Sequence, residues 1–362
     1  MMNKKEFKKR LIEYCETEGL SRYEENVAHA LVKNINSKNF EVNYDNFGSL
    51  ILHKKSKVKD APKFMIAAHM DEVGYLVRQI HEDGQILLSS VGGIWANVAI
   101  GTKATLITSD NKRYSGLFGH TSVHIMEAEA RNRAVTNKEI YADFGFKNKE
   151  EALKKNVQIG DRVLMSGETI NFDNENLVGA KAMDNRAGVT TLEYIAHQLK
   201  DLDLAVDLYL VGTVQEEVGT RGAKTSVTVI DPQIAIALDT TSTHDTIGTI
   251  AGTTALGKGA AIRIMDGAMM ANPRLVELMC KIGRKEKIKH YKFVAMGGGT
   301  DASALQYAKG GAATLTISLA QRYLHSPIGV CDIEDLMAAG DLIVETVKAI
   351  NPKVYDQEIK YH

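Results

Sequence analysis

The sequence is poor in cysteine. It contains three in 362 residues, Cys15, Cys280 and Cys331. An odd and widely spaced set is neither a disulfide framework nor the paired spacing of a zinc finger, and it is typical of a reducing compartment. We therefore expect a cytoplasmic protein.

The sequence also lacks an excess of charge of either sign and lacks long apolar runs. Its formal net charge is −1, which argues against a polyanion such as nucleic acid as the main partner. No apolar run approaches the roughly 18 residues that a membrane span needs, so we expect no membrane partner. The first residues have no apolar core of a secretory signal. Instead Phe7, Leu11 and Cys15 recur at four-residue spacing and predict an amphipathic helix.

What the sequence does contain is an alternation of short apolar runs and helical segments. The chain is longer than one core usually supports, which favours two domains. Four apolar runs predict strands buried on both faces, at residues 64–68, 208–214, 234–238 and 313–319. Helices are expected at 186–200 and in the C-terminal segment that follows Asp332, its predicted N-cap. This alternation predicts an α/β sandwich.

Two local motifs predict the starts of further helices. Ser21 and Glu24 form a capping-box pattern ahead of "ENVAHALVKNI". The glycine-rich "MGGGTDASAL" lacks the Lys-Ser/Thr ending of a phosphate-binding P-loop. We interpret it as a substrate-side or helix-starting loop, capped by Thr300 or Asp301.

Residues 73–163 have a different pattern. Asp83-Gly84 lies between two strand-like runs and predicts a hairpin, and "KATLITSDNKRYSGLFG" repeats this arrangement around a Ser-Asp-Asn turn. We therefore predict a small β-rich domain at 73–163, inserted into a larger domain formed by 1–72 and 164–362.

Metal-binding side chains follow all four predicted buried strands. Ligands of open α/β sheets gather beyond the carboxyl ends of the strands, so these groups are expected to converge. Taken singly, each has an ordinary interpretation as a surface histidine, a solvated acid or a helix cap. Their recurrence at four strand ends favours a metal site instead. The candidates are His69, Asp71, Glu216, Glu217, Asp239, His325 and, before a predicted helix, Asp184.

The donor types indicate the chemistry. Imidazole nitrogen with carboxylate oxygen, and no thiolate, suits a hydrolytic zinc, cobalt or manganese site. Residues two apart in an extended chain face the same side, so Asp71 can accept a hydrogen bond from the His69 nitrogen that faces away from the metal. Either Glu216 or Glu217 can ligate while the other remains free as a base. Glu72 is interpreted as a linker residue at the border of the insertion.

The motifs also resemble a known family. "AAHMDEVG", "GAKAMDNRAG", "VQEEVGTRGA", "ALDT", "GGGTDASALQ" and "RYLHSP" occur in the order found in the glutamyl and deblocking aminopeptidases. These are the tetrahedral aminopeptidases, sometimes mislabelled endoglucanases, and the likeness extends over essentially the whole chain. It implies a mixed-sheet α/β/α metallopeptidase domain with an inserted barrel-like (PDZ-like) dimerisation domain. It also implies dimers that join into a dodecamer.

The resemblance further implies a co-catalytic site with two divalent metal ions, zinc first, with cobalt or manganese as alternatives. His69 and Asp239 would hold one ion, Glu217 and His325 the other, and Asp184 would bridge them. The function implied is removal of N-terminal residues from short peptides.

The same resemblance implies that Glu216 is the general base acting on a metal-activated water and that Asp71 is the orienting acid. Two departures from the family pattern concern the rim of the site and the dimer contacts. Gly329 stands where an acidic residue is expected, and "GHTSVHIM" lacks paired prolines, which affects the part that His124 would play near a neighbouring subunit. Alternative functions are another dinuclear amidohydrolase (a carboxypeptidase or deacylase) and a non-catalytic metal-binding scaffold.

Overall fold

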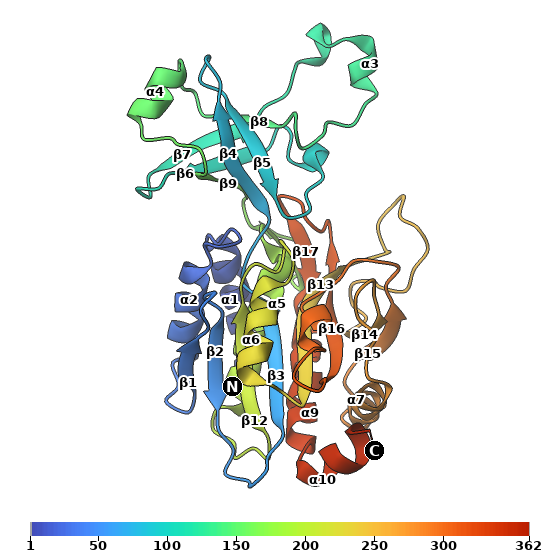
Figure 1. Cartoon of the computed structure of the whole chain (residues 1–362). Helices are drawn as coiled ribbons and strands as arrows, with labels where there is room; N and C mark the ends of the chain where they lie inside the picture. The colour runs from blue at the N-terminus through green and yellow to red at the C-terminus, as the bar shows by residue number, and fades with distance from the viewer. Residues whose placement is uncertain (1, 362) are drawn as a thin grey trace.

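A computed structural model describes residues 2–361 and shows an α/β/α unit beneath a smaller β-barrel (Figure 1). The helices of the α/β/α unit are α1 (Lys4–Glu16), α2 (Glu25–Ile35), α5 (Met183–Leu199), α6 (Arg221–Ile230), α7 (Pro273–Lys285), α8 (Ala302–Leu305), α9 (Ile333–Ala349), α10 (Pro352–Val354) and the π-helical turn η3 (Tyr355–Ile359). Its strands are β1 (Glu41–Tyr44), β2 (Leu50–Lys54), β3 (Lys63–His69), β10 (Ile170–Asn171), β11 (Leu177–Ala180), β12 (Asp207–Thr213), β13 (Ile234–Ser242), β14 (Ala260–Met265), β15 (His290–Val294), β16 (Ala313–Arg322) and β17 (Gly329–Asp332).

These strands form one mixed sheet in the order β1-β2-β12-β3-β13-β16-β17-β11-β10, with β14 beside β16 and β15 beside β14. The centre of the sheet is parallel, because β3 pairs with β12 and β13, and β13 pairs with β16. All four predicted strands are therefore confirmed, and β13 and β16 extend four and three residues, respectively, beyond their predicted ends. The predicted fold class is confirmed as well.

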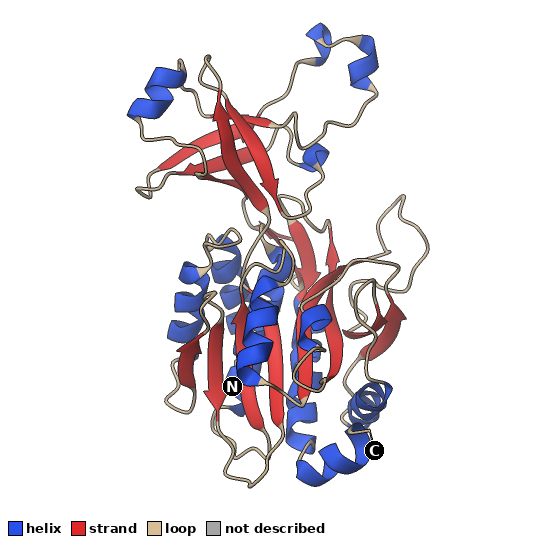
Figure 2. Ribbon diagram, in the orientation of Figure 1, coloured by secondary structure: helices blue, strands red, loops and turns tan. Residues whose placement is uncertain are grey.

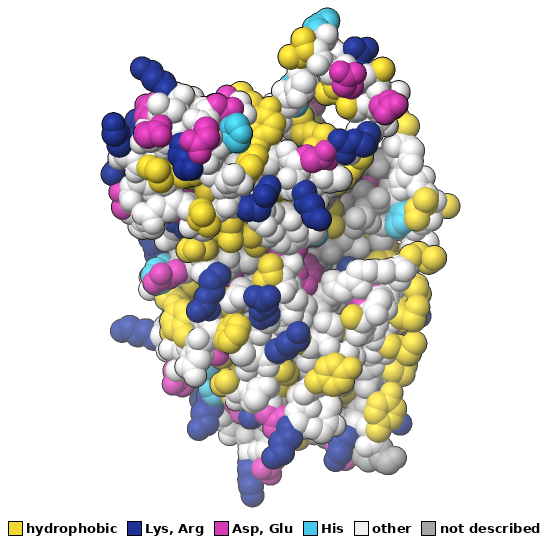
Figure 3. Space-filling model, turned by 45° about the horizontal axis from the view of Figure 1, so that its top comes forward, with side chains coloured by type: hydrophobic (Ala, Val, Ile, Leu, Met, Phe, Trp, Pro, Cys, Tyr) yellow, Lys and Arg dark blue, Asp and Glu magenta, His cyan; other side chains and the backbone are white. Residues whose placement is uncertain are grey.

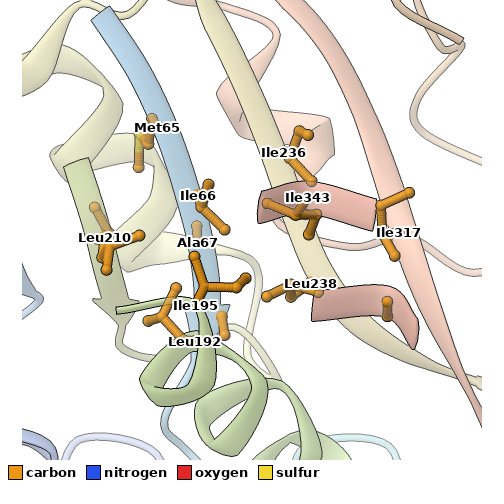
Figure 4. Packing of buried hydrophobic residues seen from close by; sticks show 14 of the residues in the cluster. Met65, Ile66, Ala67, Leu192, Ile195, Leu210, Ile236, Leu238, Ile317 and Ile343 are labelled. Atoms are coloured by element: carbon orange, nitrogen blue, oxygen red, sulfur yellow. The ribbon is translucent and has the colours of Figure 1, made fainter. Parts of the chain in front are cut away.

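Helices cover both faces of the sheet (Figure 2). On one face α5 packs against α1, α2 and α9, and on the other α6 packs against α8. Figure 4 shows Leu192 and Ile195 of α5 beside Ala67 of β3, all three fully buried. The apolar run 64–68 thus lies between two helical layers, which is why it contains no polar residue. Within residues 2–361, no helix combines the length and apolarity needed to cross a membrane.

The predicted helix starts have mixed outcomes. Asp332 is the N-cap of α9, and its side chain accepts from the Glu334 amide, as predicted. The capping box is wrong. The N-cap of α2 is Glu24 itself, without a side-chain capping hydrogen bond, because the side chains of Ser21 and Glu24 bond elsewhere.

The β-barrel stands at one end of the α/β/α unit. It closes in the order β4-β5-β8-β7-β6-β9 and has its own apolar core. Its elements are β4 (Gly74–Ile80), β5 (Ile86–Val91), η1 (Ala96–Val98), β6 (Lys103–Ile107), β7 (Arg113–Phe118), η2 (Val123–Ile125), α3 (Ala128–Arg131), β8 (Tyr141–Asp143), α4 (Lys149–Lys154) and β9 (Arg162–Ser166). The Asp83-Gly84 hairpin joins β4 to β5, with Gly84 at φ +88°. The domain boundaries at 73 and 163 stay a prediction.

Candidate metal centre

The candidate ligands meet where the central strands end. His69 is the last residue of β3, and Glu216 and Glu217 follow β12 closely. Asp239 lies in β13, and His325 follows β16. Because these parallel strands are neighbours and end at one edge of the sheet, their polar side chains lie together.

The first group of potential ligands consists of His69, Asp184 and Asp239. His69 Nε2 lies 3.1 Å from Asp184 Oδ1 and 3.5 Å from Asp239 Oδ1. One donor atom of each residue lies within 4.8 Å of the others. A single cation can therefore reach all three.

The second group shares one member with the first. His325 Nε2 lies 3.2 Å from Asp184 Oδ2 and 3.3 Å from Glu217 Oε1, and these donor atoms again lie within 4.8 Å of one another. Asp184 thus directs one carboxylate oxygen to each group. All five ligand candidates from the sequence lie together, in the grouping that the family resemblance implies.

An unwound helix start places the Asp184 carboxylate between the two histidines. Asp184 and Asn185 have non-helical backbone angles at the beginning of α5. The Asn185 side chain donates to the Leu238 carbonyl at 2.8 Å and accepts from the Gly188 amide at 3.0 Å. A Cβ on Gly188 would lie 2.4 Å from Asn185 Oδ1, so only glycine fits at this close approach. This is the tight connection in "GAKAMDNRAG".

The β-barrel side of the chain contributes to the orientation of His325. Its Nδ1 lies 2.6 Å from the carbonyl oxygen of Gly93, in the segment after β5. With the Nδ1 proton donated to that carbonyl, Nε2 is left free to face a cation. No sequence pattern points to this contact, because residues 93 and 325 come together only in the tertiary structure.

Asp71 connects several parts of the site although it belongs to neither ligand group. Its Oδ1 lies 3.4 Å from His69 Nδ1 and accepts from the Glu216 amide at 3.0 Å. Its Oδ2 accepts from the Glu217 amide and from Ser21 Oγ, at 3.2 and 2.7 Å. Burial disfavours its charge, but these contacts, beginning with that of His69, hold the pKa of Asp71 below its usual range.

Comparisons with known proteins identify the family of the chain. The family model of M42 glutamyl aminopeptidase matches residues 48–342. The chain belongs to the M42 glutamyl aminopeptidase family. It is 33% identical over 317 residues to a glutamyl aminopeptidase of Lactococcus lactis, covering 86% of this chain and 87% of that one.

Solved structures of relatives have the same fold. An aminopeptidase of the archaeon Desulfurococcus kamchatkensis superposes with a TM-score of 0.93 at 31% identity, covering 99% of both chains. The TET1 peptidase of Pyrococcus horikoshii superposes with a TM-score of 0.85 at 28% identity, covering 95% of this chain and 100% of that one. This M42 protein is therefore a metal-dependent aminopeptidase, a hydrolase of peptide bonds.

The electrostatics of the M42 site fit divalent cations. Burial raises the pKa of Glu217 to about 7, and the charge of Asp184 adds to this effect. Burial opposes a charge on His325, but the neighbouring carboxylates of Asp184 and Glu217 raise its pKa to about 11. Glu217 Oε1 is buried without a hydrogen-bond donor, even though His325 lies near. Crowded, unsatisfied carboxylate oxygens beside imidazole nitrogens are the donor set of a hydrolytic metal site.

A cavity of about 760 Å³ opens onto these residues. Glu216 lines it, and burial raises the pKa of this carboxyl well above its usual range. Among the residues that the structure describes, the lining contains no acidic residue apart from Glu216 and the metal-ligand candidates. Its cationic members are Arg263, which is paired with Asp266 at 3.1 Å, and Lys292.

The structure corrects the sequence-based interpretation of Glu72 and shows which of Thr300 and Asp301 bonds to the start of α8. Glu72 is not a simple linker residue. It is 3% exposed, and its carboxylate lies 2.6 Å from Lys181 Nζ and 3.5 Å from the Arg186 guanidinium. Asp301 does not cap α8 through its side chain, which instead accepts from Thr213 Oγ1. Thr300 is the residue whose side chain accepts from the Ala302 amide at 3.3 Å.

The structure also explains the glycine at position 329. A Cβ there would lie 2.3 Å from Gln321 Nε2 and 3.0 Å from the Cβ of Met183. Gln321, which is buried, occupies the space that a side chain at this position would need. The acidic residue implied by the family pattern therefore has no room beside this glutamine.

Proposed function

We propose that the enzyme removes N-terminal residues from short peptides with a pair of divalent cations. The observation that supports a pair is the carboxylate of Asp184, whose two oxygens face two different histidines at 3.1 and 3.2 Å. His69 and Asp239 would complete one site, and Glu217 and His325 the other. When bound, the two cations would supply Lewis acidity that lowers the pKa of a water and polarises the scissile carbonyl.

Glu216 is the general base in this proposal. It lines the cavity beside both ligand groups but belongs to neither, so its carboxylate remains free to accept a proton. Its backbone amide is held by Asp71 at 3.0 Å, which fixes where the side chain begins. A carboxyl in this place can take a proton from water and return it to the leaving amine.

The donor set supports zinc first, with cobalt and manganese as alternatives, because imidazole and carboxylate ligands suit all three. The test is a panel of aminoacyl anilides offered to protein that has been stripped of metal and reloaded with each cation. N-acetylated and C-terminal substrates serve as controls. Hydrolysis of the free-amino substrates alone is expected. Preferential hydrolysis of the acetylated or C-terminal substrates would favour a deacylase or a carboxypeptidase.

The same protein is proposed to self-associate as a dimer and dodecamer. The TET1 peptidase of Pyrococcus horikoshii assembles into a tetrahedron or a large octahedral shell. On this chain Val123 and Ile125 of the barrel are 53% and 80% exposed, and Met296 of the α/β/α unit is 93% exposed. Figure 3 shows exposed hydrophobic side chains among interspersed charges on one face. Size-exclusion chromatography with light scattering distinguishes a monomer from these assemblies, and a His124→Ala variant tests the barrel contact.

All three cysteines are free and buried. Their unpaired state supports a reducing compartment, and we place the enzyme in the cytoplasm on that ground. Fractionation of cells that express the full chain tests this assignment.

A further inference from the structure

Ser21 and Glu24 have the spacing of a capping box but do not cap a helix. They lie in the loop between α1 and α2, and the N-terminus of α2 has no side-chain cap. Both residues are nevertheless almost completely buried, at 6% and 4% exposure. Buried polar side chains need partners, and these two find theirs at the candidate metal centre.

The Ser21 hydroxyl donates to Asp71 Oδ2 at 2.7 Å. That oxygen also accepts from the Glu217 amide, and the other oxygen of Asp71 accepts from the Glu216 amide and faces His69. Ser21 is thus the one side-chain hydroxyl among the described residues that holds this carboxylate. This hydrogen bond fixes the rotation of the Asp71 carboxylate, which contacts His69 and the backbone amides of Glu216 and Glu217.

Glu24 binds the backbone just before the glutamate pair. Its Oε1 accepts from the Gln215 amide at 3.0 Å and from the Arg22 amide at 2.7 Å. Gln215 has φ +55°, a left-handed conformation that a non-glycine residue adopts only when its surroundings hold it. The hydrogen bond from the Gln215 amide to Glu24 therefore fixes the turn from which Glu216 projects into the cavity.

The loop itself is anchored to the end of β3. The Gly19 amide donates to Glu72 Oε1 at 3.0 Å, and the Glu72 amide donates to the Gly19 carbonyl at 2.9 Å. A Cβ on Gly19 would lie 2.7 Å from the Arg186 guanidinium, so the chain passes as close as glycine allows. The hydrogen bonds between Gly19 and Glu72 therefore hold the backbone that precedes Ser21 and Glu24 in place.

We propose that Ser21 and Glu24 are positioning residues that hold Asp71 and the Gln215–Glu217 turn in the arrangement needed for metal binding and catalysis. This inference rests on the proposed function of the same site. Residues that orient metal ligands through hydrogen bonds typically change metal affinity or activity by roughly 10- to 100-fold when removed. A residue that only stabilises the fold would lower the melting temperature without such a change.

The test for Ser21 compares three variants of the full chain loaded with zinc. Ser21→Ala removes the hydroxyl and is expected to lower kcat by roughly ten-fold or more with little change in KM. Ser21→Thr keeps the hydroxyl and is expected to retain most of kcat. Ser226→Ala is the matched control, because the buried Ser226 hydroxyl donates only to backbone carbonyls within α6.

The test for Glu24 uses the same logic. Glu24→Gln keeps a carbonyl oxygen that can accept from the Gln215 amide, whereas Glu24→Ala removes the acceptor. We expect Glu24→Gln to retain most of kcat and Glu24→Ala to lose at least as much as Ser21→Ala. Equal losses in the two Glu24 variants would contradict a role for the acceptor.

Zinc affinity, measured by competition with a chromophoric chelator, gives a readout independent of turnover. Ser21→Ala and Glu24→Ala are expected to bind zinc at least ten-fold more weakly than wild type, and Ser226→Ala equally well. If the wild-type protein hydrolysed no aminoacyl substrate but this affinity pattern held, the proposed function would fail and the positioning role would stand. The positioning role is overturned if Ser21→Ala matches Ser226→Ala in both kcat and zinc affinity.

Discussion

Asp71 Oδ1 accepts a hydrogen bond from the backbone amide of Glu216 at 3.0 Å. The same oxygen faces His69 Nδ1 at 3.4 Å. His69 Nδ1 also lies 3.2 Å from the backbone carbonyl oxygen of Asp71. Asp71 therefore orients a proposed metal ligand through both oxygens and fixes the backbone of the proposed base through its carboxylate. Ligand geometry and base geometry are coupled through this residue, and a change at either side of the site is expected to affect the other.

Replacing Glu216 with glutamine is expected to abolish most activity and leave metal binding intact. Glutamine keeps the size of the side chain but cannot accept the proton, and general-base catalysis is worth roughly 10²- to 10⁴-fold in rate. Steady-state kinetics with an aminoacyl anilide and metal analysis of the purified variant check both parts. Glu150→Gln, an exposed change in the barrel, is the matched control. Near-normal turnover by Glu216→Gln would show that another group is the base.

Removal of divalent cations is expected to lower the melting temperature and to abolish hydrolysis reversibly. Cations that bind only the folded state stabilise it by about 2.7 kcal/mol at a hundred times their Kd. Differential scanning fluorimetry before and after chelation, and after reloading, measures the effect. His325→Ala should lose much of the rise in melting temperature that metal reloading produces. His81→Ala, a change at an exposed hairpin residue, should keep this rise. Stabilisation of both variants to the wild-type extent would exclude His325 as a ligand.

Glu72→Ala is expected to destabilise the fold by about 3–5 kcal/mol, because it leaves the buried Arg186 guanidinium and the partly buried Lys181 ammonium group without their acid. Arg186 is fully buried, and Lys181 lies 2.6 Å from the Glu72 carboxylate. Urea unfolding of the metal-free proteins gives the free energy of unfolding. The comparison is Glu334→Ala, which breaks the exposed pair with Lys4 and should cost at most about 1 kcal/mol. Equal losses from the two changes would contradict the anchoring role of Glu72.

Substrates with basic N-terminal residues are expected to be cleaved more slowly than neutral or acidic ones. Among residues 2–361, the cavity lining has no acidic residue outside Glu216 and the metal-ligand candidates, and it includes the exposed Lys292. Lys292→Glu should raise kcat/KM for basic substrates, relative to kcat/KM for neutral substrates, by roughly five-fold. This change corresponds to the gain of about 1 kcal/mol that a solvent-exposed ion pair supplies. Lys309→Glu is also an exposed charge reversal but does not line the cavity, so it should leave the ratio unchanged.

Much of the scaffold was predictable because its signals are local. The run "FMIAA" is apolar at every position because β3 is covered on both faces, and Asp332 caps α9 through the adjacent backbone. A local signal also produced the wrong prediction of a capping box at Ser21 and Glu24, because their spacing matches that motif. Their side chains bond to residues far along the chain, and a sequence pattern carries no information about such partners.

The sequence by itself determined which side chains are available at the strand ends and that their chemistry suits a hydrolytic cation. Only the tertiary structure decided how they are shared. It directs the two oxygens of Asp184 to different histidines and brings the Gly93 carbonyl to His325. It also buries Glu72 against the side chains of Lys181 and Arg186. The physical reason is that donor type is a property of each residue, whereas distance and burial arise only when the sheet brings distant segments together.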